Sequence, residues 1–312
     1  MSKVELLNWL LFALGSIAAL AVFAAFRKSS EIIRPSRTRV LANTPDQYKL
    51  AHETVEFATA DGVRLKGWYI PAVGAESGRT IIFCHGWGSN RGELLRDTWF
   101  LAEQGFNLFY FDFRVSGESK GRVSSVGYLE TRDFDAAYEF LRVNRPHAVE
   151  AVGVFGASMG GSVAIYSAVK YPELACLLAE NTFLSYNKVV ANWGWRRMKA
   201  PYFPFVALTL FFIRRKLKAD PELYSPLYNV GKIKIPALFI NGDHDDLVPL
   251  PDAEALFGEC HSDKKQMWVI AGASHAKCAE VGGEVYRKRV SEFFTENLRE
   301  PAPEKEPAES KK

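Results

Sequence analysis

A serine flanked by glycines is the strongest chemical signal in this chain. Residues 156–160 read Gly-Ala-Ser-Met-Gly, with Ser158 at the centre and apolar stretches on both sides. Small residues around a serine permit a sharp turn from a strand into a helix, which lifts the hydroxyl out of the sheet as a nucleophile elbow. A serine hydroxyl at its ordinary pKa is a poor nucleophile, so Ser158 requires a base to take its proton.

The base and the acid that orients it are expected later in the chain. His275 lies in a loop after an apolar run, which makes it the candidate base. An acidic cluster follows another apolar run, and its members Asp243, Asp245 and Asp246 are candidates for the orienting carboxylate. Glu180 is a further candidate, because it also follows a predicted strand. The chain order of serine, acid and histidine predicts a catalytic triad.

Two backbone N–H groups are expected to stabilise the oxyanion that forms during acyl transfer. Met159 supplies the first, because it directly follows the nucleophile. The second is predicted at Trp87, in the loop 85–88 (His-Gly-Trp-Gly), where glycines permit a tight turn. We expect His85 to organise this loop rather than to act as the base, because it precedes the serine in the chain.

The elements that must position these groups alternate between strands and helices. Short apolar runs predict strands at residues 55–57, 63–70, 80–84, 108–113, 149–155, 175–179, 237–240 and 266–270. The first two flank an Asp-Gly turn and are expected to pair as an antiparallel hairpin. Helix-length amphipathic stretches separate the later runs, so we expect an α/β fold with a mostly parallel sheet and helices on both faces.

The first 40 residues contain a candidate membrane span. From Leu6 to Phe26 the only strongly polar residue is Asn8, and a helix of this length can cross the ~30 Å hydrocarbon layer. We favour a transmembrane anchor over a cleavable signal peptide, because the run is long for a signal peptide and has little positive charge before it. Five basic residues follow the span and one precedes it, so the following domain is expected on the cytoplasmic side.

Composition excludes several other classes of protein. Hydrophobic residues make up 48% of the 312 residues, enough for a large core, and the net charge is only +3. The first 40 residues carry a net charge of +4 and the remainder carries −1, so the charge pattern predicts no nucleic-acid partner. The four cysteines have no metal-ligand spacing, and no phosphate-binding glycine motif is present. We therefore expect reduced thiols and neither a metal nor a cofactor.

Several motifs together resemble one superfamily. They are residues 61–71, 85–88, 111–114, 117–121, 156–161 and 242–249. On these motifs, the chain from about Thr54 to Leu298 resembles the alpha/beta-hydrolase superfamily. It is most similar to the membrane-anchored serine hydrolases related to the fission-yeast bud-emergence homologue and their bacterial relatives. The resemblance implies an alpha/beta-hydrolase fold and a serine hydrolase activity.

The resemblance also selects among the acidic candidates. The superfamily usually places the orienting acid in an Asp-x-x-Val-Pro pattern, three residues after a glycine, which carries the role to Asp245. Three positions depart from the usual pattern. Val115 stands where a glycine is common, Ala157 where histidine or glutamine is frequent, and Asn241 where a histidine precedes the glycine. None of the three removes a group of the triad.

The resemblance implies the following division of the chain. We expect a membrane anchor at 1–28, a basic linker at 29–47, the hydrolase domain at 48–298 and a disordered tail at 299–312. The tail is expected to be disordered because it is rich in Pro, Glu and Lys and has no apolar periodicity. Within the domain, residues of about 185–230 interrupt the alternation of strands and helices, at the position where this superfamily inserts a cap.

The predicted cap combines aromatic and basic residues. Between residues 185 and 219 it contains eight aromatic and eight basic residues: Tyr186, Trp193, Trp195, Tyr202, Phe203, Phe205, Phe211, Phe212, Lys188, Arg196, Arg197, Lys199, Arg214, Arg215, Lys216 and Lys218. One interpretation is a buried helix with a solvated basic face. The other is a cap that touches lipid, because aromatic and basic side chains suit the headgroup region.

The predicted function is a single-pass membrane serine hydrolase that cleaves a carboxylic ester or thioester through an acyl-enzyme intermediate. Ser158 is the nucleophile, His275 the base and Asp245 the orienting acid, and the Trp87 and Met159 amides form the oxyanion hole. Lipid-like acyl substrates are favoured by the anchor. Two alternatives are a serine peptidase or amidase with the same triad, and a catalytically idle interaction module tethered to the membrane. The sequence leaves the oligomeric state open.

Overall fold

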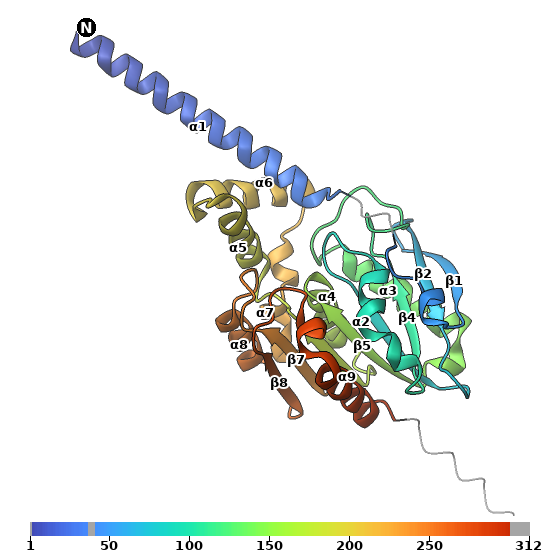
Figure 1. Cartoon of the computed structure of the whole chain (residues 1–312). Coiled ribbons are helices and arrows are strands. Elements are labelled where there is room, and N and C mark those ends of the chain that lie inside the picture. The colour runs from blue at the N-terminus through green and yellow to red at the C-terminus, as the bar shows by residue number, and fades with distance from the viewer. Residues whose placement is uncertain (1, 37–40, 300–312) are drawn as a thin grey trace, which may run out of the picture.

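The computed structural model describes residues 2–36 and 41–299, which contain one eight-stranded sheet. Its strand order is β1-β2-β4-β3-β5-β6-β7-β8 (Figure 1). The strands are β1 (Glu53–Ala58), β2 (Arg64–Ile70), β3 (Arg79–Cys84), β4 (Asn107–Phe111), β5 (Ala151–Ala157), β6 (Cys176–Glu180), β7 (Ala237–Gly242) and β8 (Lys265–Ile270). Each of the eight predicted strands is present within a few residues, and the predicted fold class is confirmed.

The direction of the strands brings the predicted site residues to one edge of the sheet. β1 and β2 form the predicted antiparallel hairpin, and β2 also pairs with β4 in antiparallel orientation. The remaining neighbours pair in parallel. The carboxyl ends of β3, β5, β6, β7 and β8 therefore meet at the same edge, where ligands of open α/β sheets bind.

Helices cover both faces of the sheet. The helices of the described residues are α1 (Lys3–Ile33), α2 (Arg91–Thr98), α3 (Glu130–Asn144), α4 (Met159–Lys170), α5 (Tyr186–Met198), α6 (Ala207–Leu217), α7 (Pro226–Asn229), α8 (Leu250–Glu259) and α9 (Cys278–Asn297). Among them, α3 and α4 pack on one face of the sheet and α2 and α9 on the other. Shorter helical turns lie at Pro45–Tyr48, Trp99–Ala102, Pro146–Ala148, Tyr202–Val206, Pro221–Tyr224 and Val230–Lys232.

Alternate residues of each central strand pack against different helical layers. In β3, Ile82 belongs to the apolar cluster with α3 and α4, whereas Ile81 and Phe83 belong to the cluster with α2 and α9. In β5, Val154 belongs to the cluster with α3 and α4, and Phe155 to the cluster with α2 and α9. Strands buried on both faces require continuous apolar runs, which is why these strands were visible in the sequence.

The first helix, α1, is long and apolar enough to cross a membrane, and it extends away from the sheet (Figure 1). Most of its side chains are exposed. Its C-terminal part differs, because Ala25, Ser29, Ile32 and Ile33 are buried. These positions follow the spacing i, i+4, i+7 and i+8 and so form one helical face.

That buried face is packed against the cap helix α6. The ring of Phe26 meets the ring of Phe212 edge-on, with centroids 5.4 Å apart. The ammonium group of Lys216 lies over the Phe26 ring and donates to the Phe26 carbonyl at 2.9 Å and to the Ser29 hydroxyl at 2.6 Å. The C-terminal end of α1 is therefore integrated into the domain.

Residues 29–33, expected in the basic linker, instead continue α1, because their apolar face is covered by the cap. The division into anchor, linker, hydrolase domain and tail otherwise stays a prediction. Linker residues 37–40 and tail residues 300–312 lie outside the described residues. The segment that interrupts the alternation of strands and helices contains α5, α6 and α7 and lies between β6 and β7.

Candidate active site

Ser158 lies on a sharp turn between β5 and α4. Its backbone has φ 53° and ψ −115°, a conformation that residues with side chains rarely adopt. The Ser158 N–H donates to the carbonyl of Glu180 at 2.8 Å, which ties the turn to the end of β6. A Cβ atom at Gly160 would lie 1.9 Å from the Cys84 carbonyl oxygen. The close approach of α4 to β3 therefore requires a glycine at this position.

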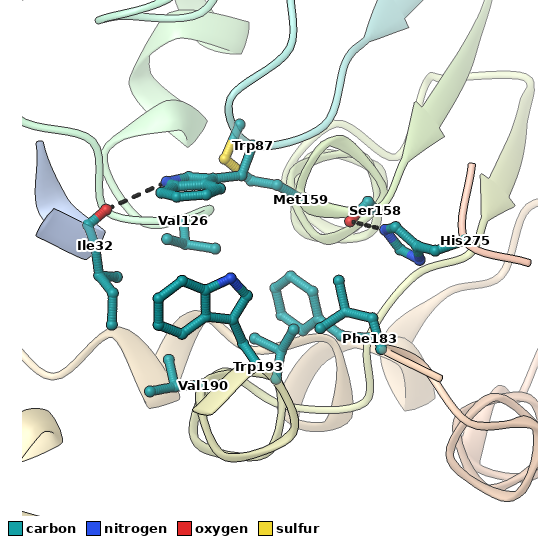
Figure 2. A pocket seen from close by; sticks show the side chains of 11 residues that line it. Ile32, Trp87, Val126, Ser158, Met159, Phe183, Val190, Trp193 and His275 are labelled. Atoms are coloured by element: carbon teal, nitrogen blue, oxygen red, sulfur yellow. Dashed lines mark hydrogen bonds between the residues drawn. The ribbon is translucent and has the colours of Figure 1, made fainter. Parts of the chain in front are cut away.

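His275 connects the serine to a buried carboxylate. Its Nε2 atom lies 3.1 Å from the Ser158 hydroxyl oxygen, and its Nδ1 atom lies 2.7 Å from Oδ2 of Asp245 (Figure 2 shows the first contact). The three residues follow β5, β8 and β7 at the carboxyl edge of the sheet. The structure thus brings together the three predicted members of the triad.

The other acidic candidates have different partners. Asp243 accepts a hydrogen bond from the Gly272 N–H at 2.6 Å, and Asp246 pairs with Arg196 at 2.8 Å on the surface. Glu180 is buried and accepts a hydrogen bond from the Tyr286 hydroxyl at 2.6 Å. Burial raises the pKa of Glu180 to about 7. The carboxylate that contacts His275 is that of Asp245.

Backbone and side-chain donors fix the orientation of Asp245. Its Oδ1 atom accepts from the N–H groups of Leu247 at 3.0 Å and Val248 at 2.8 Å. Its Oδ2 atom accepts from the side-chain amide of Asn181 at 2.8 Å. Asn181 in turn accepts from the thiol of Cys278, whose pKa is raised by burial so that it keeps its proton. With these donors on both oxygens, Asp245 can present Oδ2 to the Nδ1–H of His275 in one geometry.

Sequence reasoning missed the contact between Asn181 and Asp245. Asn181 directly follows β6, and so it lies at the same edge of the sheet as the triad. That position was the available signal, because a polar residue at the carboxyl end of a central strand faces the site. Its backbone has φ 44°, in the left-handed region that asparagine tolerates better than most residues.

Of the two predicted oxyanion donors, Met159 follows the serine directly in the chain, and Trp87 belongs to a loop that lies close to the serine in space. Met159 is the first residue of α4, where helix N–H groups have no partner within the helix. The loop containing Trp87 approaches the serine, because a Cβ atom at Gly86 would lie 3.5 Å from the Cβ atom of Ser158. The indole N–H of Trp87 donates to the Ile32 carbonyl at 3.2 Å. The use of these two backbone amides as an oxyanion hole stays a prediction.

His85 holds the Trp87 loop from within. The Phe113 N–H donates to Nε2 of His85 at 3.0 Å, so the proton of a neutral ring is on Nδ1, which lies 2.8 Å from the Gly86 carbonyl. Burial lowers the pKa of His85, which favours this neutral form. Both ring nitrogens are thus engaged within the loop and its neighbour, as expected of a residue that organises the loop.

An apolar cavity of about 150 Å³ opens beside the serine and the histidine (Figure 2). Its walls come from α1, the Trp87 loop, α4, α5 and the loops that follow β4, β5, β6, β7 and β8. The lining residues are Ile32, Trp87, Val126, Ser158, Met159, Phe183, Val189, Val190, Trp193, Leu247 and His275. Apart from Ser158 and His275, these side chains are aliphatic or aromatic or end in a thioether. A mostly apolar cavity with two converging polar groups is typical of a substrate site.

Within the described part of the chain, no group of three or more His, Cys, Asp or Glu side chains is placed to hold a metal ion. The four cysteines are buried and free.

Comparison with known proteins shows that the chain is similar to hydrolases in sequence and in fold. Residues 75–220 match the family model described as serine aminopeptidase, S33. The esterase Pf2001 of Pyrococcus furiosus is 29% identical and superposes with a TM-score of 0.73, over 86% of this chain and 99% of the esterase. The chain has the alpha/beta-hydrolase fold. Its described fold and its hydrolase class follow from these matches.

Relatives of this alpha/beta hydrolase occur in fungi and bacteria. Protein bem46 of Schizosaccharomyces pombe is 27% identical over 267 residues, which cover 84% of this chain and 83% of the relative. Protein YqkD of Bacillus subtilis is 27% identical over 238 residues, 76% of this chain and 77% of the relative. A relative in Saccharomyces cerevisiae bears the name of a membrane protein. It is 26% identical over 272 residues, which cover 84% of this chain and 89% of the relative. Together with α1, this match indicates membrane association of the hydrolase.

The buried Glu180 predicts a pH dependence of stability. Its pKa rises from an ordinary value of 4.5 to about 7 in the folded state, so the folded protein holds a proton that the unfolded chain releases. Stability relative to a Glu180→Gln variant should be highest below about pH 4.5 and should fall as the pH rises to about 7. The loss should be on the order of 3 kcal/mol. Thermal unfolding of both proteins between pH 4.5 and 8 measures it.

The Glu284→Gln variant is the matched control for this experiment, because Glu284 is an exposed glutamate on α9. It should show the same pH dependence as the wild type. A constant difference in stability between the wild type and Glu180→Gln across this pH range would contradict the assignment of a buried, proton-holding carboxyl group.

Proposed function

We propose that this alpha/beta hydrolase cleaves a carboxylic ester or thioester through an acyl-enzyme intermediate on Ser158. The observation that carries the proposal is the position of His275, which lies within hydrogen-bond distance of both the Ser158 hydroxyl and the buried Asp245 carboxylate. This arrangement meets the geometric requirement for an activated serine nucleophile.

The proposed mechanism follows from these contacts. Nε2 of His275 takes the hydroxyl proton as Ser158 attacks the carbonyl carbon of the substrate, and Asp245 stabilises the resulting imidazolium. The Met159 and Trp87 N–H groups donate to the oxyanion. His275 then gives the proton to the leaving alcohol or thiol, which departs as the acyl-enzyme forms. A water molecule, deprotonated by His275, releases the carboxylic acid and restores Ser158.

The pocket favours an apolar acyl group over the free amino end of a peptide. An aminopeptidase needs a carboxylate near its substrate's ammonium group, because an unpaired charge is costly to bury. The described residues that line the cavity include no Asp or Glu. The serine aminopeptidase description of the matching family model keeps a peptidase as the second candidate. Parallel assays with p-nitrophenyl esters, acyl thioesters and aminoacyl amides distinguish the two.

We further propose that α1 is a single-pass anchor and that the catalytic domain lies on the cytoplasmic side. Support for the anchor comes from the length and apolar surface of α1. Support for the orientation comes from the greater number of basic residues after the span than before it.

The cap supports a lipid-like substrate. Its exposed aromatic side chains are Trp195, Tyr202, Phe203 and Phe211, and Phe203 is 79% exposed. Arg197, Lys199 and Arg215 are exposed within the same segment. The cap also packs against the C-terminal part of α1, so it lies where the anchor leaves the bilayer. Aromatic and basic side chains at that level match the chemistry of an anionic headgroup region.

The first prediction concerns the nucleophile. The Ser158→Ala variant should lose hydrolysis by roughly 10⁶-fold in kcat, because the acyl-enzyme can no longer form. Labelling of the full-length protein by a fluorophosphonate probe should also disappear, while the thermal unfolding temperature stays near that of the wild type.

The Ser162→Ala variant, on the helix that follows Ser158 but outside the cavity lining, serves as the control and should label normally. Labelling of Ser158→Ala would refute the proposed nucleophile. A folded wild type that neither labels nor hydrolyses the substrates would instead support the idle module.

The second prediction concerns the orienting acid. The Asp245→Asn variant should lower kcat on the order of 10⁴-fold, because an amide donor facing Nδ1 favours the wrong histidine tautomer. The Asp243→Asn variant is the matched control, because its side-chain oxygen can still accept from the Gly272 N–H. The reverse pattern, with Asp243→Asn inactive and Asp245→Asn nearly normal, would move the role to Asp243.

The third prediction concerns the membrane surface. The double variant Arg197→Glu/Arg215→Glu should slow hydrolysis of a bilayer-resident ester by about fivefold or more in anionic vesicles, because each basic residue contributes ~1 kcal/mol near such a surface. Added salt should shrink the difference. Hydrolysis of a soluble short ester should be unchanged.

The control for the third prediction is Lys264→Glu/Lys288→Glu, which changes the net charge equally. Lys264 precedes β8 at the opposite edge of the sheet, and Lys288 is 77% exposed on α9. Equal slowing by both double variants would show that net charge matters and that the cap surface does not.

A further inference from the structure

We propose that the C-terminal end of the membrane anchor forms the far wall of the acyl-binding pocket, and that Ile32 limits the length of the acyl chain. This inference rests on the proposed function and adds to it a specificity-determining residue on a helix that the sequence assigns to the membrane. Ile32 belongs to α1 and lines the same cavity as Ser158 and His275.

The position of Ile32 fits the end of a chain-binding pocket. Ile32 and His275 lie at opposite ends of the cavity, with Trp87, Val126 and Trp193 between them (Figure 2). An acyl chain attached to the serine would run along these apolar side chains and end at Ile32. Ile32 is only 6% exposed, so its side chain closes this end of the cavity against solvent.

Contacts from three sides hold this wall in place. The indole N–H of Trp87 donates to the Ile32 carbonyl at 3.2 Å. Lys216 of α6 donates to the Ser29 and Ser30 hydroxyls at 2.6 Å and 2.5 Å, one turn before Ile32. The Lys28 ammonium lies 5.8 Å from the centre of the Trp193 ring of α5. The anchor is thus bonded to the Trp87 loop and to the cap, which are the other walls of the cavity.

The volume of the cavity indicates the size of the acyl group. An apolar protein cavity of about 150 Å³ accommodates benzene, so a cavity of this volume accepts roughly six carbon atoms. An Ile→Ala substitution removes three carbon atoms from the wall and makes room for two or three additional methylene groups. Each buried methylene contributes roughly fourfold to binding.

The experiment compares Ile32→Ala with Ile33→Ala in the full-length protein in detergent. Both side chains are buried at the end of α1, but Ile33 is outside the cavity lining, which makes it a matched control for packing. We would measure kcat/KM for p-nitrophenyl esters with acyl chains of two to twelve carbons. In the same preparations, we would measure the rates of inactivation by alkyl fluorophosphonates of increasing chain length.

The wild type should prefer chains of about six carbons or fewer. The Ile32→Ala variant should extend the preferred length by two or three carbons and raise the ratio of kcat/KM for longer over shorter esters by roughly tenfold or more. The Ile33→Ala variant should keep the wild-type profile, even if its unfolding temperature falls. The opposite substitution, Ile32→Phe, should shorten the preferred chain and provides a second variant if Ile32→Ala is unstable.

The outcomes separate this inference from the proposed function. If all variants are labelled and show identical chain-length profiles, the proposed role of Ile32 as a wall is refuted, and the proposed serine hydrolase activity still stands. Equal shifts in Ile32→Ala and Ile33→Ala would also overturn it, because the effect would then come from looser packing of α1. If the wild type shows neither labelling nor hydrolysis, the proposed function is refuted, and so is the role of Ile32 that rests on it.

Discussion

The strained turn at Ser158 is the constraint on which the rest of the site depends. A side-chain-bearing residue at φ 53° and ψ −115° costs of order 1–3 kcal/mol and persists only when its surroundings hold it. The hydrogen bond from Ser158 to the end of β6 does so on one side. On the other side, Gly160 lets α4 approach the last carbonyl of β3 more closely than any side chain would permit. The turn thus gains its rigidity from the parallel sheet, and the acid and the histidine reach it from the loops that follow β7 and β8 at the same edge.

The same edge of the sheet also explains why the polar residues around the triad are so completely paired. Asp245 is a buried carboxylate, and a buried charge without hydrogen bonds is costly. Leu247, Val248 and Asn181 supply those bonds, and Cys278 holds Asn181. Glu180 is buried differently, because burial raises its pKa to about 7, so that it holds a proton below that pH, and the Tyr286 hydroxyl donates to it.

Much of this architecture was predictable from the sequence because it depends on short-range patterns. Strands buried on both faces appear as apolar runs, and the elbow appears as Gly-Ala-Ser-Met-Gly, so the fold class and the position of Ser158 could be read directly. The choice of Asp245 among four acidic candidates depended on resemblance, because distances between separate loops are not encoded in local patterns. Asn181 and Ile32 escaped notice for the same reason. Ile32 looked like part of a linker, although the spacing of Ala25, Ser29, Ile32 and Ile33 is helical and marks a face that is covered.

The burial of Ile32 has a consequence for how such an enzyme changes over evolution. Residues at the end of α1 pack on the cap, bond to the Trp87 loop and line the cavity at once. On the proposed pocket, one short stretch of chain specifies both where the protein resides and which acyl groups it accepts. Replacing the anchor to move the protein to another membrane would alter its acyl-chain specificity at the same time. Membrane location and substrate specificity would therefore change together unless the last turns of α1 are preserved.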